Sequence, residues 1–345
     1  MQMKILVIGP SWVGDMVMSQ SLYRELKSRH PKSTIDVLAP AWCGPILERM
    51  PEVDNAIDMP VGHGDFSLAK RWRIGRQLAS NHYTHAFILP NSAKSALIPL
   101  FAGIPTRTGW KGEMRYGLLN DLRPDKRVFQ YMVERYVALA STKSAMQAEV
   151  TLEKCLKPKL TINPKQQDIL RQRFSLISDR EIFGLCPGAE FGPAKRWPSH
   201  YYAELAADLI TRGKQIWLFG SQKDQEVTQN IRDLLSTEHQ SHCFDLAGKT
   251  TLIEVVDLLA CCHTVVSNDS GLMHIAAAVD CNIVAIYGSS SPQYTPALSD
   301  NVITLNTDIE CRPCFKRECP YGHLNCLNQL TPDKVINRLK TQQTK

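Results

Sequence analysis

The stretch TVVSNDSGLMHIAAA, residues 264–278, decides the fold class. Residues 264–267 are mostly β-branched, which predicts a short buried strand, and residues 271–278 are mostly small and apolar, which predicts a buried helix. Asn268 and Asp269 connect these two elements with almost no intervening loop. A strand that passes directly into a helix is the repeating unit of α/β folds.

The same stretch also predicts a binding site. Asp269, Ser270 and Gly271 fall in the first turn of the expected helix, where several main-chain N–H groups have no partner within the helix. Gly271 lets a ligand approach the main chain closely, so we expect an anion to bind here. His274, one turn further along, either faces this site or packs the helix against the sheet, and the sequence leaves both roles open.

Strand and helix patterns alternate on both sides of this stretch. In the second half we expect strands at residues 182–186, 215–219 and 283–287, helices at 199–212, 225–235 and 251–260, and a last helix starting at Thr331 and Pro332. In the first half we expect strands at residues 4–9, 34–38 and 85–89 and a helix at 17–29. The strands are apolar without alternation, which indicates parallel sheets covered on both faces.

Residues 155–164 interrupt this pattern with Lys, Pro and Asn, and are interpreted as a linker. The predicted fold class is therefore α/β, with two Rossmann-like doubly wound domains, residues 1–160 and 161–345. Parallel sheets bind ligands at the carboxyl ends of their strands, so we expect the two domains to face a central cleft. The last helix is a candidate for packing back on the first domain. The alternative, a single barrel, requires eight regular units without a break.

Composition restricts the class of protein. The chain has 345 residues, 43% hydrophobic and 21% charged, as in ordinary globular proteins. We find no apolar run near the roughly 18 residues that span a bilayer. Residues 1–9 are interpreted as a buried strand rather than a signal peptide. Eleven cysteines without a secretion signal then indicate a reducing cytoplasm, where most serve as small buried apolar residues.

Positive charge is concentrated in the first half. Residues 1–150 hold 19 Lys and Arg against 13 Asp and Glu, whereas residues 151–345 hold 21 of each. Between residues 70 and 127, eleven basic residues stand against Glu113, Asp121 and Asp125. An anionic substrate, an anionic membrane surface or a solvated face without a partner each explain this excess. A nucleic-acid-binding protein would more often have a higher isoelectric point and interleaved aromatic residues.

Three further loops carry candidate residues. Asp15 ends the motif GPSWVGD, residues 9–15, and is either a general base at a helix N-terminus or a helix cap. The loop PGAEFGPAKRWP, residues 187–198, either holds phosphate oxygens, with Lys195 neutralising a departing diphosphate, or is an ordinary surface loop. Asp224 ends the turn FGSQKD, residues 219–224, where an acid can accept hydrogen bonds from a ribose.

Four cysteines gather near the C-terminus. Cys311, Cys314, Cys319 and Cys326 lie within sixteen residues, and the first two have the Cys-x-x-Cys spacing of a structural zinc site. The later spacings are unusual for such a site. Structural zinc, a labile disulfide and free thiols in a turn-rich lobe therefore all stay open.

Taken together, six segments resemble one known family. They are residues 3–16, MKILVIGPSWVGDM; 39–43, APAWC; 89–92, LPNS; 108–120, TGWKGEMRYGLLN; 186–198, CPGAEFGPAKRWP; and 268–274, NDSGLMH. In this order they resemble the bacterial ADP-heptose:lipopolysaccharide heptosyltransferase family, over nearly the whole chain. The four-cysteine lobe is not a general feature of that family.

The resemblance implies the two-Rossmann architecture called GT-B. It implies inverting transfer of L-glycero-D-manno-heptose from ADP-heptose to the first heptose of the inner core, on heptosyl-Kdo-lipid A. Asp15 then matches the base, and Lys195 the group that stabilises the leaving diphosphate. The implied donor-binding residues are Gly14, Glu190, Lys195, Ser221, Asp224, Thr250, Asp269, Ser270, Gly271 and His274. No metal or other cofactor is implied, which agrees with the lack of an Asp-x-Asp pair.

An acceptor that is an anionic lipid gives the basic first domain a role. We expect acceptor contacts from Asn91, Ser92, Lys94, Arg107, Lys111 and Arg115, and a basic acceptor side that includes Lys70, Arg71, Arg73 and Arg76. The protein is then a cytoplasmic monomer in peripheral contact with the inner membrane, without a nucleic-acid partner. The alternatives are a member of the same family with a different acceptor, a nucleotide-sugar epimerase of the same double build, and a non-catalytic nucleic-acid-binding protein.

Overall fold

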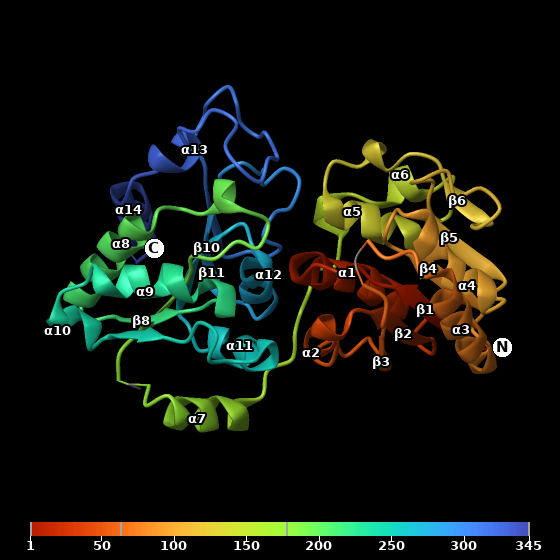
Figure 1. The fold of residues 1–345 in the computed structure, drawn as a ribbon, viewed down its shortest axis with the longest axis horizontal. Helices are drawn as coiled ribbons and strands as arrows, with labels where there is room; N and C mark the ends of the chain where they lie inside the picture. Colours follow the sequence, from red (N-terminus) through yellow and green to blue (C-terminus); the bar gives the residue numbers. More distant parts are fainter. Residues whose placement is uncertain (1, 63, 177–178, 344–345) are drawn as a thin grey trace. The chain divides into compact units, whose positions relative to one another are not determined.

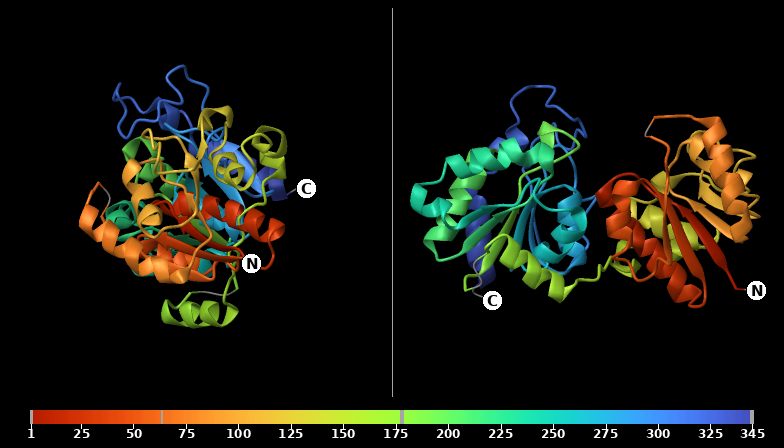
Figure 2. Two further views of the ribbon diagram at one scale, coloured as in Figure 1. Left: turned by 90° about the vertical axis from the view of Figure 1, so that its right-hand side faces the viewer. Right: turned by 60° about the horizontal axis from the view of Figure 1, so that its bottom comes forward.

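A computed structural model describes residues 2–62, 64–176 and 179–343 (Figure 1). The chain forms two compact units, residues 1–158 and 159–345, divided two residues before the predicted boundary. Each unit contains one six-stranded sheet, and helices lie on both faces of each sheet (Figure 2). The prediction of two doubly wound α/β units is therefore confirmed, and the single barrel is excluded.

The first unit alternates strands and helices along the chain. Its strands are β1 (Lys4–Ile8), β2 (Thr34–Ala39), β3 (Asn55–Asp58), β4 (His85–Ile88), β5 (Thr106–Trp110) and β6 (Asp121–Arg123). Its helices are α1 (Val13–Arg29), α2 (Gly44–Leu47), α3 (Leu68–Leu78), α4 (Leu97–Phe101), α5 (Met132–Val137) and α6 (Met146–Glu149).

The first sheet has the order β3-β2-β1-β4-β5-β6, with all neighbouring strands parallel. Ile5, Leu6 and Val7 of β1 are completely buried because helices cover both sides of this strand. α1 packs against α5, and α3 packs against α4. The chain builds β1 to β3 in one direction and then returns to place β4 on the other side of β1, so the topological switch point lies between β1 and β4.

The second unit repeats the pattern. Its strands are β7 (Ile182–Cys186), β8 (Gln215–Leu218), β9 (Cys243–Asp245), β10 (Thr264–Asn268), β11 (Asn282–Ile286) and β12 (Val302–Leu305). Its helices are α7 (Pro164–Arg173), α8 (Ser199–Thr211), α9 (Gln225–Asp233), α10 (Thr237–Gln240), α11 (Leu252–Leu259), α12 (Gly271–Ala278), α13 (Asn325–Asn328) and α14 (Pro332–Gln343).

The second sheet has the order β12-β11-β10-β7-β8-β9, again parallel throughout, so its switch point lies between β7 and β10. α14 packs against α8, and its residues Val335 and Leu339 are buried in the core of this unit. The suggestion that the last helix returns to the first unit is wrong, because its apolar face is used here. In the part of the chain that the structure describes, no helix is long and apolar enough to cross a bilayer.

Arg115 is a buried structural cation of the first unit. Its side chain is 0% exposed, and its guanidinium donates to the carbonyl oxygens of Trp110 and Pro90 and, at 3.4 Å, to the hydroxyl of Ser95. Burial lowers its pKa to about 10, so it stays charged at neutral pH. The prediction that Arg115 contacts the acceptor is wrong, because its donors are enclosed and joined to the main chain.

Replacing Arg115→Met should destabilise the first unit. The carbonyl groups of Trp110 and Pro90 would lose their donor inside the protein, and each unsatisfied group costs about 1–3 kcal/mol. We expect the free energy of unfolding in urea to fall by about 3 kcal/mol.

Arg73→Met, at an exposed position of α3, is the matched control and should leave that free energy unchanged. Equal effects of the two substitutions would contradict the structural role of Arg115.

Candidate functional site

The switch point of the second sheet is held together by Asn268, the last residue of β10. Its side chain is completely buried. The side-chain amide donates to the carbonyl of Pro187, which follows β7, at 2.6 Å. Its oxygen accepts from the main-chain N–H of Trp197 at 3.0 Å and from the hydroxyl of Tyr202 at 3.2 Å. One amide therefore fixes both ends of the loop at residues 187–197 beside the start of α12, a role that the sequence interpretation missed.

Lys195, Asp269 and His274 meet at this point. The ammonium of Lys195 lies 2.6 Å from Oδ2 of Asp269, and Nε2 of His274 lies 4.0 Å from Oδ1 of the same carboxylate. Asp269 and His274 are each 4% exposed. Burial lowers the pKa of His274 to about 4, with a smaller contribution of the same sign from Lys195, so the imidazole is neutral at physiological pH. His274 thus packs within the unit and also reaches the carboxylate.

The first turn of α12 lies beside this ion pair. Ser270 is the N-cap residue and Gly271 the first helical residue, as the sequence predicts. Lys195 ends the short 3-10 turn Pro193–Lys195, and its ammonium lies 5.1 Å from the centre of the Phe191 ring. A helix N-terminus and a half-buried lysine together provide N–H donors and a positive charge for an anionic ligand.

The turn after β8 closes on the same loop. Oδ2 of Asp224 accepts from the main-chain N–H and the hydroxyl of Ser221, which forms a capping box. A Cβ at Gly188 would lie 2.5 Å from Oδ1 of Asp224, so glycine lets this loop approach the carboxylate closely. Glu190, on the same loop, pairs with Lys223 at 2.6 Å. Asp224 therefore stabilises the turn after β8, in addition to its expected contact with a ribose.

Thr250 lies in a loop that is joined to this turn, since Gly248 donates its N–H to the carbonyl of Gly220 at 3.0 Å. It follows β9, the edge strand of the sheet, and its hydroxyl donates to the carbonyl of Leu246 at 3.4 Å. The turn that carries Ser221 and Asp224 is thus in contact with the loops that carry Glu190 and Thr250.

The candidate residues of the first unit follow three neighbouring strands. Gly14 and Asp15 lie in the first turn of α1, directly after β1, and both are half-buried. The field of the helix N-terminus stabilises the ionised carboxylate of Asp15. Asn91 and Ser92 follow β4, and Lys111 follows β5. Because β1, β4 and β5 are parallel neighbours, these residues share the carboxyl edge of the sheet at its switch point.

The loops at this edge are joined by main-chain bonds. Glu113 donates its N–H to the carbonyl of Asn91 at 3.0 Å, and its carboxylate accepts from the N–H of Ala93 at 2.9 Å. Lys94, in the short 3-10 helix after Ser92, is half-buried. The ammonium of Lys111 lies 5.3 Å from the centre of the Tyr116 ring. The loops at this carboxyl edge therefore carry four of the residues predicted to contact the acceptor: Asn91, Ser92, Lys94 and Lys111.

Two other arginines do not belong to the acceptor side. Arg71 is 5% exposed, and its guanidinium donates to the carbonyl oxygens of residues 65, 66 and 94. Arg107 lies in the first half of β5, away from the carboxyl edge, and donates to the carbonyl oxygens of Leu118 and Ile104. The predicted acceptor roles of Arg71 and Arg107 are therefore wrong, because both cations are bound to the main chain.

The remaining basic residues of α3 accompany exposed apolar side chains. Lys70, Arg73 and Arg76 are exposed, and Trp72 is 55% exposed on the same helix. Phe66 and Leu68, at the start of the helix, are 58% and 48% exposed. We call these six residues the α3 surface. The sequence interpretation found the charges but missed the apolar component.

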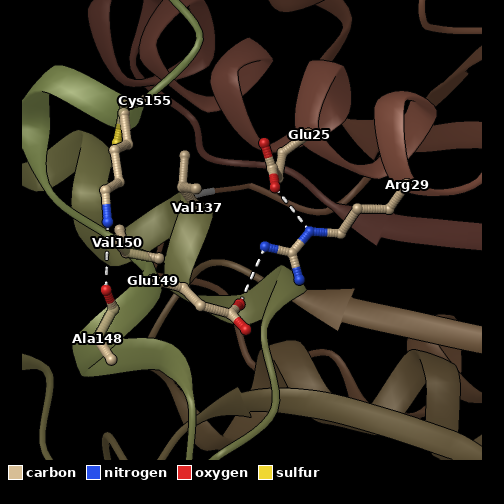
Figure 3. Close-up of a pocket in the computed structure, with 8 residues that line it drawn as sticks. Glu25, Arg29, Val137, Ala148, Glu149, Val150 and Cys155 are labelled. Atoms are coloured by element: carbon tan, nitrogen blue, oxygen red, sulfur yellow. Dashed lines mark hydrogen bonds and ion pairs between the residues drawn. The ribbon is translucent and has the colours of Figure 1, made fainter.

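A cavity of about 370 Å³ in the first unit lies away from these residues. It is lined by α1 and residues 148–155, and Arg29 bridges Glu25 at 2.6 Å and Glu149 at 3.1 Å beside it (Figure 3). Arg29 and Asp15 are fourteen residues apart on one helix, which separates them by about 21 Å. The paired charges fasten residues 148–155 to α1, and the cavity is not part of the candidate site.

Comparison with known proteins agrees with this geometry. The model of glycosyltransferase family 9 (heptosyltransferase) matches residues 71–325. The chain is 53% identical to lipopolysaccharide heptosyltransferase 2 of Salmonella typhimurium, covering 98% of this chain and 97% of that protein. It is 52% identical to lipooligosaccharide heptosyltransferase 2 of Haemophilus influenzae, covering 98% of each chain.

A solved structure supports the same relationship. Escherichia coli ADP-heptose lipopolysaccharide heptosyltransferase II superposes with a TM-score of 0.89 at 49% identity, covering 99% of this chain and 100% of that chain. The resemblance inferred from the six sequence segments is confirmed, and so is the GT-B-like fold class that it implied. The chain belongs to glycosyltransferase family 9, the heptosyltransferases.

Proposed function

We propose that this protein transfers L-glycero-D-manno-heptose from ADP-heptose to the first heptose of the lipopolysaccharide inner core, on heptosyl-Kdo-lipid A. The observation that carries the proposal is the identity of about half of all residues with lipopolysaccharide heptosyltransferase 2 over nearly the full length of both chains. Substrate specificity depends on loops throughout the chain, so a match of this extent favours the same donor and acceptor.

The second unit is the proposed donor side. An ADP diphosphate would accept from the N–H groups at the start of α12 and from the ammonium of Lys195, which now pairs with Asp269 at 2.6 Å. Ser270, Gly271 and His274 complete this side, with Gly14 contributed by the first unit. Ser221, Asp224, Glu190 and Thr250 are proposed to contact the nucleoside.

The first unit is the proposed acceptor side. Asp15 accepts the proton of the acceptor hydroxyl while that oxygen attacks the anomeric carbon of the heptose. The bond between this carbon and the diphosphate oxygen breaks, the electron pair leaves with ADP, and the configuration inverts. Asn91, Ser92, Lys94 and Lys111 are proposed to position the acceptor.

The proposed chemistry needs no cofactor. Negative charge develops on the leaving diphosphate, and Lys195 with the N-terminus of α12 can stabilise it. We therefore expect added Mg²⁺ to leave kcat unchanged.

Wild-type protein should add one heptose to heptosyl-Kdo-lipid A, and Asp15→Ala should lower kcat by about 10² or more without weakening ADP binding. The measurements are the mass of the product lipid, initial rates and calorimetry with ADP. Glu48→Ala, at an exposed acid of the same unit, is the control and should keep full activity.

An unchanged kcat in Asp15→Ala would make Asp15 a helix cap rather than the base. Transfer to Kdo-lipid A that carries no heptose would assign a different acceptor. Consumption of ADP-heptose without any acceptor would favour an epimerase.

We further propose that the α3 surface binds the anionic membrane that carries the acceptor, with the protein acting as a monomer. Surfaces that enter the lipid headgroup region combine exposed tryptophan or phenylalanine with lysine and arginine, as the α3 surface does. Replacing Trp72→Ala together with Arg73→Gln should weaken binding to phosphatidylglycerol vesicles about tenfold. Co-sedimentation at two salt concentrations measures this binding.

Ile169→Ala with Lys165→Gln is the matched control, because α7 also carries an exposed apolar residue and an exposed lysine one turn apart. Equal loss of vesicle binding in both double variants would contradict a specific membrane surface on α3.

A further inference from the structure

The four cysteines of the C-terminal lobe surround one small cavity. Cys311, Cys314, Cys319 and Cys326 all line a space of about 20 Å³ beside α13, in the blue segment of Figure 1. A space of this size holds one water-sized particle. The chain folds the four thiols of this sixteen-residue segment around a volume fit for a single ion.

Main-chain N–H groups are directed at one of these thiols. The N–H groups of Leu324 and of residues 321–323 are hydrogen-bonded to the side chain of Cys319. The chain achieves this with left-handed residues, since Gly322 and Leu324 have φ of 72° and 48°. Phe315, directly after Cys314, is also left-handed, with φ of 53°. Outer hydrogen bonds of this kind hold a metal-binding side chain in place.

In their present orientations, the four cysteine side chains do not form a metal site. In the described part of the chain, no three His, Cys, Asp or Glu side chains are arranged to hold a metal ion. The main chain nevertheless places all four cysteines on the wall of one cavity. A cysteine has a single side-chain torsion with three staggered states, so rotation about Cα–Cβ redirects each sulfur without moving the main chain.

The lobe is attached to the turn that carries Lys195. The N–H of Ala194 donates to the carbonyl of Arg317 at 3.0 Å, and its carbonyl accepts from Ser289 at 3.1 Å. Ser289 in turn accepts from the N–H of Phe315 at 2.8 Å. A Cβ at Gly192 would lie 2.5 Å from the carbonyl oxygen of Arg317, so the two segments are in close contact.

A shared aromatic ring adds a second connection. The guanidinium of Arg317 lies 5.5 Å from the centre of the Phe191 ring, and the ammonium of Lys195 lies 5.1 Å from it. The position of Lys195 therefore depends on residues between Cys314 and Cys319, a segment that contains no helix or strand of its own.

We propose that Cys311, Cys314, Cys319 and Cys326 bind one zinc ion as four thiolates, and that this structural centre fixes the turn Pro193–Lys195. Four thiolates around one ion is the ligand set of structural zinc sites. Arg312 lies in the wall of the same cavity, and its positive charge offsets part of the negative charge of such a centre. The metal binding stands on the cysteines alone, whereas its consequence for Lys195 rests on the function proposed above.

The direct test is elemental analysis of the full-length protein, purified with a reductant and without chelator. We expect about one zinc per chain, falling below about 0.2 in Cys314→Ser and in Cys319→Ser. Cys261→Ser is the matched control, because Cys261 is also partly exposed in the same unit but lies at the end of α11. If wild-type protein contains less than about 0.2 zinc but about one iron per chain, the four-thiolate site is supported and zinc is the wrong metal.

Wild-type protein with neither metal, or with these cysteines in disulfides by mass spectrometry, would overturn the proposal. If the serine variants do not fold, cobalt substitution of the wild type decides, since thiolate-to-cobalt absorption is expected only with cysteine ligands. Metal-free protein should bind ADP about tenfold more weakly than the zinc form. If metal-free and zinc-bound protein bind ADP equally well, the proposed effect of the metal on Lys195 is wrong. Loss of transfer activity alone would bear on the proposed function and not on the metal site.

Discussion

The buried amide of Asn268 is the interaction on which the candidate donor side depends. It joins the ends of β7 and β10 by bonding to Pro187, Trp197 and Tyr202. Every polar group of a completely buried amide must be satisfied locally, because water cannot reach it. The amide therefore permits only one path for the loop at residues 187–197, and that path places Lys195 against Asp269. A charged cluster is thus positioned by a neutral side chain that hydrogen-bonds to three partners.

Topology explains why both units present their candidate residues at comparable places. In each sheet the chain reverses its direction of strand addition once, between β1 and β4 and between β7 and β10. The loops after these strands diverge to opposite faces and leave room for side chains and ligands. Asp15 and Asn91 occupy this position in the first unit, and Lys195 and Asp269 occupy it in the second. A transferase needs a binding site for each of its two substrates, and each unit of this chain carries one set of candidate residues.

The sequence predicted the fold well where strands are buried on both faces. β1 and β7 are mostly apolar, β10 is rich in β-branched residues, and all three were predicted. β3 is largely exposed, and β6 and β9 have three residues each, so none of these three gives a clear pattern. Among site residues, Lys195 and Asp269 came from motifs. Arg71, Arg107 and Arg115 were misassigned, because their guanidinium groups donate to main-chain carbonyl groups, and the sequence does not show these bonds. A sequence shows that a residue is basic, but not whether its charged group is already hydrogen-bonded inside the folded protein.

The most direct test of the donor side is calorimetric titration of wild type, Lys195→Met and Lys165→Met with ADP. Lys195 pairs with Asp269 at the start of α12, whereas Lys165 is an exposed lysine of α7. Loss of a charge-assisted hydrogen bond costs about 1.5–3 kcal/mol, so Lys195→Met should weaken ADP binding about tenfold or more and Lys165→Met should not. ADP affinity that is the same in Lys195→Met and wild type would contradict the account.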